Sequence, residues 1–195
     1  MPYPTPTPKL CKCLKTVRNG SLPPELLAPI PGGFVHTCAF KSWKALLAHA
    51  KRDKIVIKPT SSVDTYRPGD IQERAFFARY EKVKADDPRL KDPKAITRKY
   101  EDAVWLLKPG NAPCSTPRNS NHGLGIAIDV ANASGKIFDW MVANASTYGW
   151  YLQTGDPKKP GFESWHWQYT LGRVWTDPNE TAAPAPETAP APPAT

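Results

Sequence analysis

The segment Ser120-Asn-His-Gly-Leu-Gly-Ile-Ala-Ile-Asp129 restricts the fold of this chain more than any other. Its second half alternates between apolar and small residues, which predicts a strand with one face in a core. The apolar face holds Ile126, Ile128 and Val130. The opposite face consists of small residues that end in Asp129, so we expect it to form the floor of a cleft.

His122 precedes Asp129 by an odd number of residues, which would place the two side chains on opposite faces of a straight strand. Gly123 and Gly125 lie between them and permit a turn that brings both to one side. A histidine near an aspartate is often only a structural hydrogen bond. This pair alone therefore leaves both interpretations open.

The segment Glu163-Ser-Trp-His166 adds a second imidazole and a carboxylate. Two histidines and one aspartate form a zinc site with one open position, and Glu163 is then a candidate base for the water in that position. The oxyanion that develops needs a second positive group, for which Arg67 is the best candidate. A surface salt bridge is the alternative for Arg67. His36 and His49 are weaker candidates as ligands.

The charge and composition limit the kinds of partner that the chain can have. The chain has 195 residues and a net charge of +8, which favours a polyanion such as an anionic cell wall polymer, or is simply a basic surface without a partner. No nucleic-acid motif is present, so we expect no nucleic-acid partner. No apolar run is long enough to span a bilayer, and the N-terminus lacks the apolar region of a signal peptide. We expect a monomer made in the cytoplasm.

Four cysteines leave several possibilities open. Cys11 and Cys13 are too close for a comfortable mutual bridge, although each can pair with a distant partner such as Cys38 or Cys114. Free thiols are the first expectation, and one structural disulfide is the alternative. Four cysteines can also bind a metal, but no Cys-x-x-Cys pair is present.

Local patterns predict the elements before the first histidine. Residues 1–40 are rich in Pro and Gly and predict an irregular arm. Ser42 is predicted to cap a helix, and Asp70 to cap a second one. Residues 55–57 predict a strand, and residues 85–118 predict long loops with one short helix near residues 99–105. The inward faces of the two helices are predicted to hold Trp43, Leu46, Leu47 and Ala50, and Phe76, Tyr80 and Val83.

The elements after Asp129 are a helix and a strand. The helix has Phe138, Met141, Val142 and Ala145 on one face, and Gly149 suits its C-terminal end. The strand alternates from Trp165 to Thr170. We expect its aromatic residues to pack behind the sheet and His166 to point forward. The tail from residue 181 is a Pro/Ala segment, predicted to be extended.

These motifs resemble the zinc D-alanyl-D-alanine carboxypeptidases of VanY type, a group that includes phage endolysins. The resemblance covers roughly residues 18–175 and includes the flanking segments at residues 19–23 and 140–150. The matching patterns are Ser120-x-His122-x-x-Gly125-x-Ala127-x-Asp129, Glu163-x-Trp165-His166 and Asp64-Thr-Tyr-Arg67-x-x-x-x-Gln72. Arg118, Asn119 and Pro68-Gly69 depart from the family pattern at the border of the site, which bears on substrate preference.

The resemblance implies an α+β fold, in which a small antiparallel sheet carries the zinc ligands and helices pack on one side. It implies a Pro-rich arm at residues 1–17, a peptidase domain at 18–176 and a disordered tail at 177–195. One Zn²⁺ per chain is expected on His122, Asp129 and His166, with Glu163 and Arg67 as catalytic residues. The expected substrate-binding residues are Arg67, Asp64, Tyr66, Gln72, Ser120 and Trp165.

The expected function is therefore hydrolysis of an amide bond in peptidoglycan stem peptides, with removal of a terminal D-Ala as the first expectation. An endopeptidase that cuts L-Ala-D-Glu or a cross-bridge is the nearest alternative. A non-catalytic wall-binding module is an alternative of another class, although it has no use for Glu163. The absence of a signal peptide favours delivery to the wall at phage lysis or from a virion.

Overall fold

The computed structural model describes residues 2–158 and 161–177, so the Pro/Ala tail expected from residue 181 lies outside the described residues. Within these ranges the α-helices are α1 (Thr37–Arg52), α2 (Gly69–Arg79) and α3 (Gly135–Asn144). Short 3-10 helices occupy Lys12–Lys15, Pro24–Leu26, Ser62–Asp64, Pro88–Lys91, His122–Leu124 and Ala145–Tyr148. No helix among the described residues is long and apolar enough to cross a membrane.

The strands form three small antiparallel sheets in the described chain. The first pairs β1 (Leu27–Ile30) with β2 (Gly33–His36). The second has the order β3 (Tyr80–Val83), β5 (Ala103–Leu107), β4 (Thr97–Tyr100). The third, called here the central sheet, has the order β6 (Ala127–Asp129), β8 (His166–Tyr169), β7 (Trp150–Leu152). The expected α+β fold with a small antiparallel sheet is confirmed.

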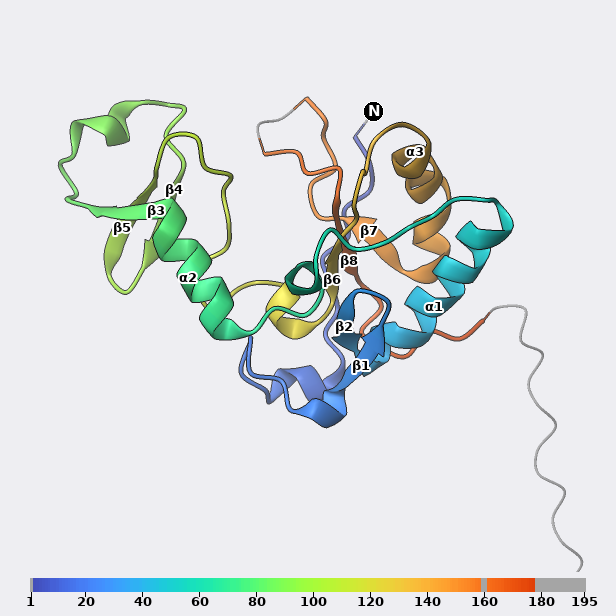
Figure 1. Cartoon of the computed structure of the whole chain (residues 1–195). Helices are drawn as coiled ribbons and strands as arrows, with labels where there is room; N and C mark the ends of the chain where they lie inside the picture. Colours follow the sequence, from blue (N-terminus) through green and yellow to red (C-terminus); the bar gives the residue numbers. More distant parts are fainter. Residues whose placement is uncertain (1, 159–160, 178–195) are drawn as a thin grey trace, which may run out of the picture.

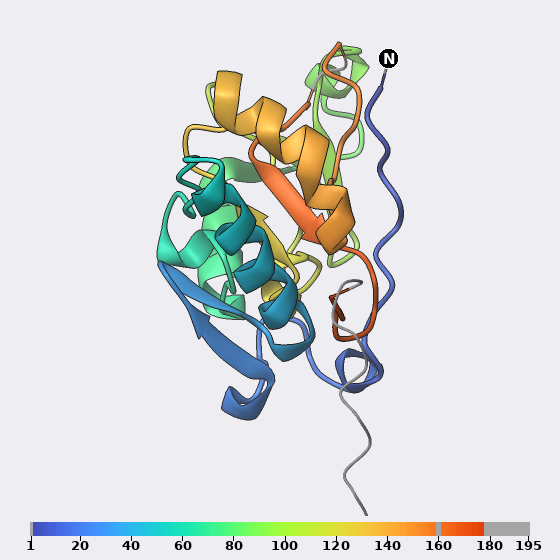
Figure 2. The same cartoon turned by 90° about the vertical axis from the view of Figure 1, so that its right-hand side faces the viewer.

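Helices α1 and α3 lie on one face of the central sheet (Figure 2). The core between them contains Trp43 of α1, Met141 of α3 and Trp150 of β7, all fully buried. The rings of Trp43 and Trp150 meet edge to face at 5.0 Å, an arrangement that stabilises aromatic pairs. The predicted apolar face of residues 126–130 is confirmed, because its three aliphatic residues are buried in this core.

Helix α1 begins five residues before the predicted cap. His36 occupies the N-cap, and its Nδ1 accepts a hydrogen bond from the Cys38 backbone N–H at 3.1 Å. Ser42 is buried inside the helix instead, where its hydroxyl donates to the Tyr148 carbonyl oxygen and accepts from Trp150 Nε1. The cap prediction was wrong because these tertiary partners satisfy a hydroxyl that is otherwise typical of a helix end.

Three further local predictions were wrong. Residues 55–57 are not a strand. Helix α2 has Pro68 as its N-cap, and Asp70 lies in the first turn, paired with Arg74 at 3.1 Å. The helix ends at Arg79, so Tyr80 and Val83 belong to strand β3 and not to its inward face.

Residues 85–118 contain a hairpin where loops and a short helix were predicted. Strands β4 and β5 are joined at Glu101 and Asp102, whose φ angles are +48° and +53°. Positive φ at both positions is the geometry of a tight hairpin turn, for which Asn-Gly or Asp-Gly is the usual signal. The missing glycine explains why the pattern did not reveal it. The sheet β3–β5–β4 lies beside α2, away from the central sheet (Figure 1).

The C-terminal predictions are mostly confirmed. Met141 is buried on α3, and Gly149, with φ +78°, ends the 3-10 helix that continues it. His166 begins β8, and the rings of Trp167 and Tyr169 are buried behind it. Trp165 was expected behind the sheet as well, but it precedes the strand and is 41% exposed.

The N-terminal arm runs along segments from the C-terminal part of the described chain. The Tyr3 backbone N–H donates to the Gly155 carbonyl oxygen at 2.7 Å, and Lys9 forms an isolated bridge with Leu171. Further along, a disulfide joins Cys11 to Cys38, 27 residues later, at the start of α1. The expectation of free thiols was therefore wrong for these two residues, because the fold brings distant segments together. In the described chain Cys13 and Cys114 are unpaired.

Candidate metal centre

The central sheet places Asp129 directly opposite His166. These residues pair across β6 and β8 in the antiparallel register, so their side chains leave the same face. His122 comes from the 3-10 turn just before β6, which ends at Gly125 with φ +64°. The Gly125 carbonyl oxygen accepts a hydrogen bond from the His36 backbone N–H at 2.8 Å. The turn predicted between the two ligands is therefore present, and strand β2 holds it.

The three side chains converge through one atom each. Oδ1 of Asp129 lies 2.8 Å from Nδ1 of His166 and 3.3 Å from Nε2 of His122. The two ring nitrogens are 3.3 Å apart. Zn–N bonds of about 2.0–2.1 Å in a tetrahedral site place neighbouring ligand atoms about 3.3 Å apart. The donor set and its spacing therefore fit one tetrahedral ion with a position left for another ligand.

The protonation of His122 strengthens this fit. Its Nδ1 lies 2.9 Å from the Thr65 carbonyl oxygen, which can only accept, so the ring proton is on Nδ1. In the neutral ring Nε2 then presents a lone pair to the carboxylate of Asp129 and to His166, whereas with an added proton it donates to that carboxylate. Such a cluster of acceptors in a buried place requires a cation or added protons between them. An outer carbonyl that orients a ligating imidazole is also typical of metal sites.

The electrostatics of the two nearby carboxylates differ. Burial raises the pKa of Asp129, but hydrogen bonds and charge from His122 and His166 outweigh it and hold this pKa well below its usual range. Burial also raises the pKa of Glu163; the charge of His166 opposes this change, and the charge of Asp129 adds to it. Asp129 is thus kept as an anion suited to a metal, whereas Glu163 is suited to exchange a proton.

Arg67 is held rigidly beside the centre. Its Nε donates to the Val63 carbonyl oxygen at 2.9 Å, and its two terminal nitrogens donate to Gln72 Oε1 at 2.9 Å and Asp64 Oδ1 at 3.0 Å. One terminal nitrogen is also 3.9 Å from Asp129 Oδ2. These bonds use three of the five guanidinium N–H donors, which leaves two for a ligand.

A cavity of about 550 Å³ opens over these residues. Its walls come from both sides of the molecule: the central sheet with its loops, and α2 with β4 and the segment after β5 (Figure 1). The residues of the expected site that line it are Asp64, Arg67, Ser120, His122, Asp129, Glu163, Trp165 and His166. The structure therefore gathers most of the expected residues around one space large enough for a peptide end.

Two expected substrate-binding residues do not line this cavity. The Tyr66 hydroxyl accepts a hydrogen bond from the Leu22 backbone N–H at 3.1 Å, and its ring packs against the core. Gln72 is buried; it accepts from Arg67 and donates to the Ser115 carbonyl oxygen at 2.7 Å. Gln72 is thus placed to position Arg67. Tyr66 is placed to anchor the segment around Leu22, which follows the N-terminal arm.

The cavity residues that sequence reasoning missed include two arginines and a thiol, namely Arg79, Arg98 and Cys114. Arg79 ends α2, and Arg98 lies on β4, where loops were predicted. Nothing in the sequence distinguished these arginines from the other basic residues, because their position depends on the hairpin. The only signal was the expectation that residues around 85–118 form the pocket walls.

Comparison with known proteins agrees with this geometry. The family model "VanY: D-alanyl-D-alanine carboxypeptidase" matches residues 33–173, which is more than half of the chain. The chain belongs to the VanY family of D-alanyl-D-alanine carboxypeptidases. The expected enzyme class, a carboxypeptidase-like hydrolase of peptidoglycan processing, is thereby confirmed. No curated protein matches the chain.

Solved structures resemble this VanY-family chain at low identity. The LdcB LD-carboxypeptidase, whose structure concerns peptidoglycan recognition, is 20% identical with a TM-score of 0.54; the match covers 78% of this chain and 72% of LdcB. VanYB in complex with D-alanine-D-alanine is 16% identical with a TM-score of 0.48, over 75% and 77% of the chains. A VanY D,D-pentapeptidase mutant in complex with Zn(II) is 17% identical, also with a TM-score of 0.48, over 77% and 83%. The likeness to LdcB supports the fold.

Proposed function

We propose that this chain is a zinc-dependent carboxypeptidase that removes the terminal D-Ala from peptidoglycan stem peptides, with one ion on His122, Asp129 and His166. The observation that carries the proposal is the mutual approach of three ligand atoms to 2.8–3.3 Å, with the outer nitrogen of His122 on the Thr65 carbonyl. Three acceptor atoms turned toward one point in a buried place are an arrangement that a bound cation stabilises.

The chemistry divides among the residues of the cavity. Zinc held here would lower the pKa of a water molecule and polarise the scissile carbonyl. The Glu163 carboxylate would accept the proton of the attacking water and pass it to the leaving amine, a role that its raised pKa favours. Trp165, exposed at the rim of the cavity, would cover one side of the peptide.

Arg67 would bind the negative charge of the substrate. A carboxypeptidase must recognise a free C-terminal carboxylate, and a guanidinium fork matches that group with two parallel hydrogen bonds. The two free donors of Arg67 meet this need while Asp64 and Gln72 fix its plane. The same charge would stabilise the oxyanion that develops beside it.

Arg79 and Arg98 support a stem peptide as the substrate. Both line the wall opposite the central sheet, where Arg79 contacts the Ala112 carbonyl oxygen at 3.5 Å and Arg98 the Cys114 carbonyl oxygen at 3.3 Å. Stem peptides carry further carboxylates upstream of the terminal D-Ala. Two arginines on this wall would attract them and orient the chain in the cavity.

Product analysis tests the proposal. The purified zinc-loaded chain is incubated with muropeptides that end in D-Ala-D-Ala, and the products are weighed by mass spectrometry. We expect loss of a single D-Ala, and a decrease in rate of about 10²–10⁴-fold in Glu163→Gln, because the proton transfer is lost. Glu163→Gln should keep its zinc, since Glu163 is not a ligand. Absence of any zinc-dependent cleavage in wild type would refute the enzymatic proposal.

The same product masses separate the alternatives. An endopeptidase that cuts L-Ala-D-Glu or a cross-bridge would release a larger fragment, and a wall-binding module would release none. A module bound by charge should still bind cell walls in the variant His122→Ala. Its binding should weaken as the salt concentration rises, as expected for a basic surface on an anionic polymer. Action at the wall after phage lysis or from a virion stays a prediction, as does the monomeric state.

A further inference from the structure

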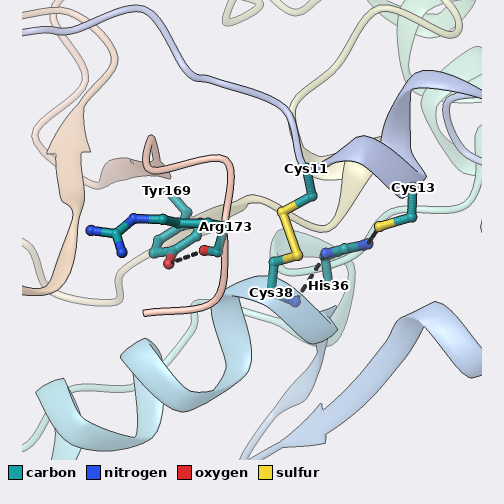
Figure 3. Close-up of a disulfide and its surroundings, with 6 residues drawn as sticks. All are labelled: Cys11, Cys13, His36, Cys38, Tyr169 and Arg173. Atoms are coloured by element: carbon teal, nitrogen blue, oxygen red, sulfur yellow. Dashed lines mark hydrogen bonds between the residues drawn. A yellow bond between two sulfur atoms is a disulfide. The ribbon is translucent and has the colours of Figure 1, made fainter. Parts of the chain in front are cut away.

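A second group of metal-binding residue types lies away from the cavity, at the start of α1 (Figure 3). Cys11 and Cys13 come from the N-terminal arm, the latter within the 3-10 helix Lys12–Lys15. His36 ends β2, and Cys38 lies in the first turn of α1. Two segments that are distant in the sequence, the arm and the junction of β2 with α1, thus bring three of the four cysteines and one histidine together.

The donor atoms of this cysteine cluster, Cys11, Cys13, His36 and Cys38, are close to one another. The sulfurs of Cys11 and Cys38 and one ring nitrogen of His36 lie within 4.8 Å of each other. The Cys13 sulfur is 3.5 Å from His36 Nε2. Zn–S bonds of about 2.3 Å in a tetrahedral site place sulfurs about 3.8 Å apart. Cys13 lies outside that three-residue group, so its side chain must move toward the other two sulfurs before all four residues can surround one ion.

The disulfide uses only half of the cluster. It joins Cys11 to Cys38, while Cys13 is a free thiol beside the ring of His36, which is fully buried. His36 Nδ1 accepts from the Cys38 backbone N–H, so Nε2 carries the ring proton and donates to the Cys13 sulfur. A disulfide alone requires neither residue. Three thiols and an imidazole without a carboxylate are, however, a complete ligand set for structural zinc.

We propose that the chain with reduced thiols binds a second, structural zinc ion through Cys11, Cys13, His36 and Cys38. Binding replaces the three S–H bonds by sulfur–zinc bonds and releases three protons to the solvent; no electron moves. His36 would bind through Nε2, whose proton moves to Nδ1, so the hydrogen bond from the Cys38 backbone N–H to Nδ1 is given up in the zinc form. The disulfide forms from the same thiols by loss of two electrons and two protons, with molecular oxygen or a small disulfide as the acceptor. The zinc form and the disulfide form are thus alternative products of one reduced chain.

The ion would tie the arm to the candidate catalytic turn. Cys11 and Cys13 belong to the arm, and the backbone N–H of His36 donates to the Gly125 carbonyl oxygen between His122 and Asp129. A closed four-ligand site has no open position for substrate, so its role is structural. Loss of this zinc should therefore release the arm and lower stability without replacing any group that contacts substrate.

Cobalt spectroscopy on the full reduced chain tests the proposal. The chain is kept in a phosphine reductant and titrated with Co²⁺. We expect the intense near-ultraviolet absorption of thiolate-bound cobalt, which the sulfur-free centre at His122, Asp129 and His166 cannot produce. The double variant Cys11→Ser/Cys38→Ser should lose this absorption. Cys114→Ser is the matched control and should keep it, because Cys114 lies in the cavity wall.

Alkylation of the wild-type chain gives a second readout that no folding defect can confuse. The reduced chain is treated with iodoacetamide in the presence of zinc or of a chelator, and the labelled peptides are quantified. Zinc should protect Cys11, Cys13 and Cys38 together and leave the labelling of Cys114 unchanged. Equal labelling with and without zinc, together with no thiolate–cobalt absorption, would overturn the proposal and leave the cluster as a disulfide pair only.

Discussion

Replacing Gly125 by alanine should destabilise the turn that positions His122 relative to Asp129 in the candidate metal centre. Gly125 has φ +64°, a conformation that costs an L-residue about 1–2 kcal/mol. An added Cβ would also lie 2.7 Å from the His36 backbone nitrogen, closer than real Cβ contacts occur. That nitrogen donates to the Gly125 carbonyl, so separation of β2 from the turn weakens a hydrogen bond worth about 0.5–1.5 kcal/mol. The sum predicts a destabilisation of about 1.5–3.5 kcal/mol.

Gly110→Ala is the matched control for this substitution. Gly110 has φ +76°, but nothing lies within 4 Å of an added Cβ. The free energy of unfolding of Gly110→Ala should therefore fall only by the cost of positive φ for an L-residue, about 1–2 kcal/mol. Urea denaturation of the zinc-loaded, disulfide-intact variants gives both free energies of unfolding, and the difference between them isolates the clash with β2.

Activity provides the second assay for Gly125→Ala. The turn sets the position of His122 relative to Asp129, and misplacement of a reacting group by about 1 Å can cost about 10²-fold in rate. We expect hydrolysis of D-Ala-D-Ala peptides to fall strongly in Gly125→Ala and to stay near wild type in Gly110→Ala. If both variants lose the same stability and keep the same activity, the turn does not constrain the centre as argued.

Three further outcomes follow from the contacts described. Arg67→Lys should lower kcat/KM by about 10²–10³-fold without unfolding, because an ammonium cannot replace the fork of donors; kinetics near wild type would exclude the role of Arg67. Met141→Ala should cost about 2–5 kcal/mol in urea denaturation, whereas Val56→Ala at an exposed position should stay within about 0.5 kcal/mol; equal losses would contradict the assigned core. In the disulfide-intact protein, free zinc at about 100 times its Kd should add about 2.7 kcal/mol of stability; a gain that persists in His166→Ala would place the ion elsewhere.

The candidate ligands could be inferred from the sequence because their signals are local. The alternation after Gly125 predicts the face of Asp129, and the glycines at positions 123 and 125 permit the turn that brings His122 to the same side. The ligand types, two imidazoles and a carboxylate, limit which metal ion suits them. The buried faces of α1 and α3 follow from helical spacing in the same way. These features depend on neighbours a few residues apart; the turn and the buried faces are confirmed, whereas the ligand roles stay predictions.

The remaining features depend on contacts between distant segments. The Glu101–Asp102 turn carries no glycine, so only the pairing of β4 with β5 reveals the hairpin that brings Arg98 to the cavity. Ser42 resembled a cap until its buried partners Tyr148 and Trp150 were known. The meeting of Cys11 and Cys38 likewise requires the arm to close on α1.

Short motifs in the sequence thus identify the candidate groups of this chain, namely a set of ligands, a base and an arginine. The tertiary structure decided where those groups meet, which walls enclose them and which cysteines become neighbours. Backbone preferences and periodicity depend on residues that are neighbours in the sequence. Packing and strand pairing instead join segments that are far apart in the sequence, so a local pattern does not reveal them.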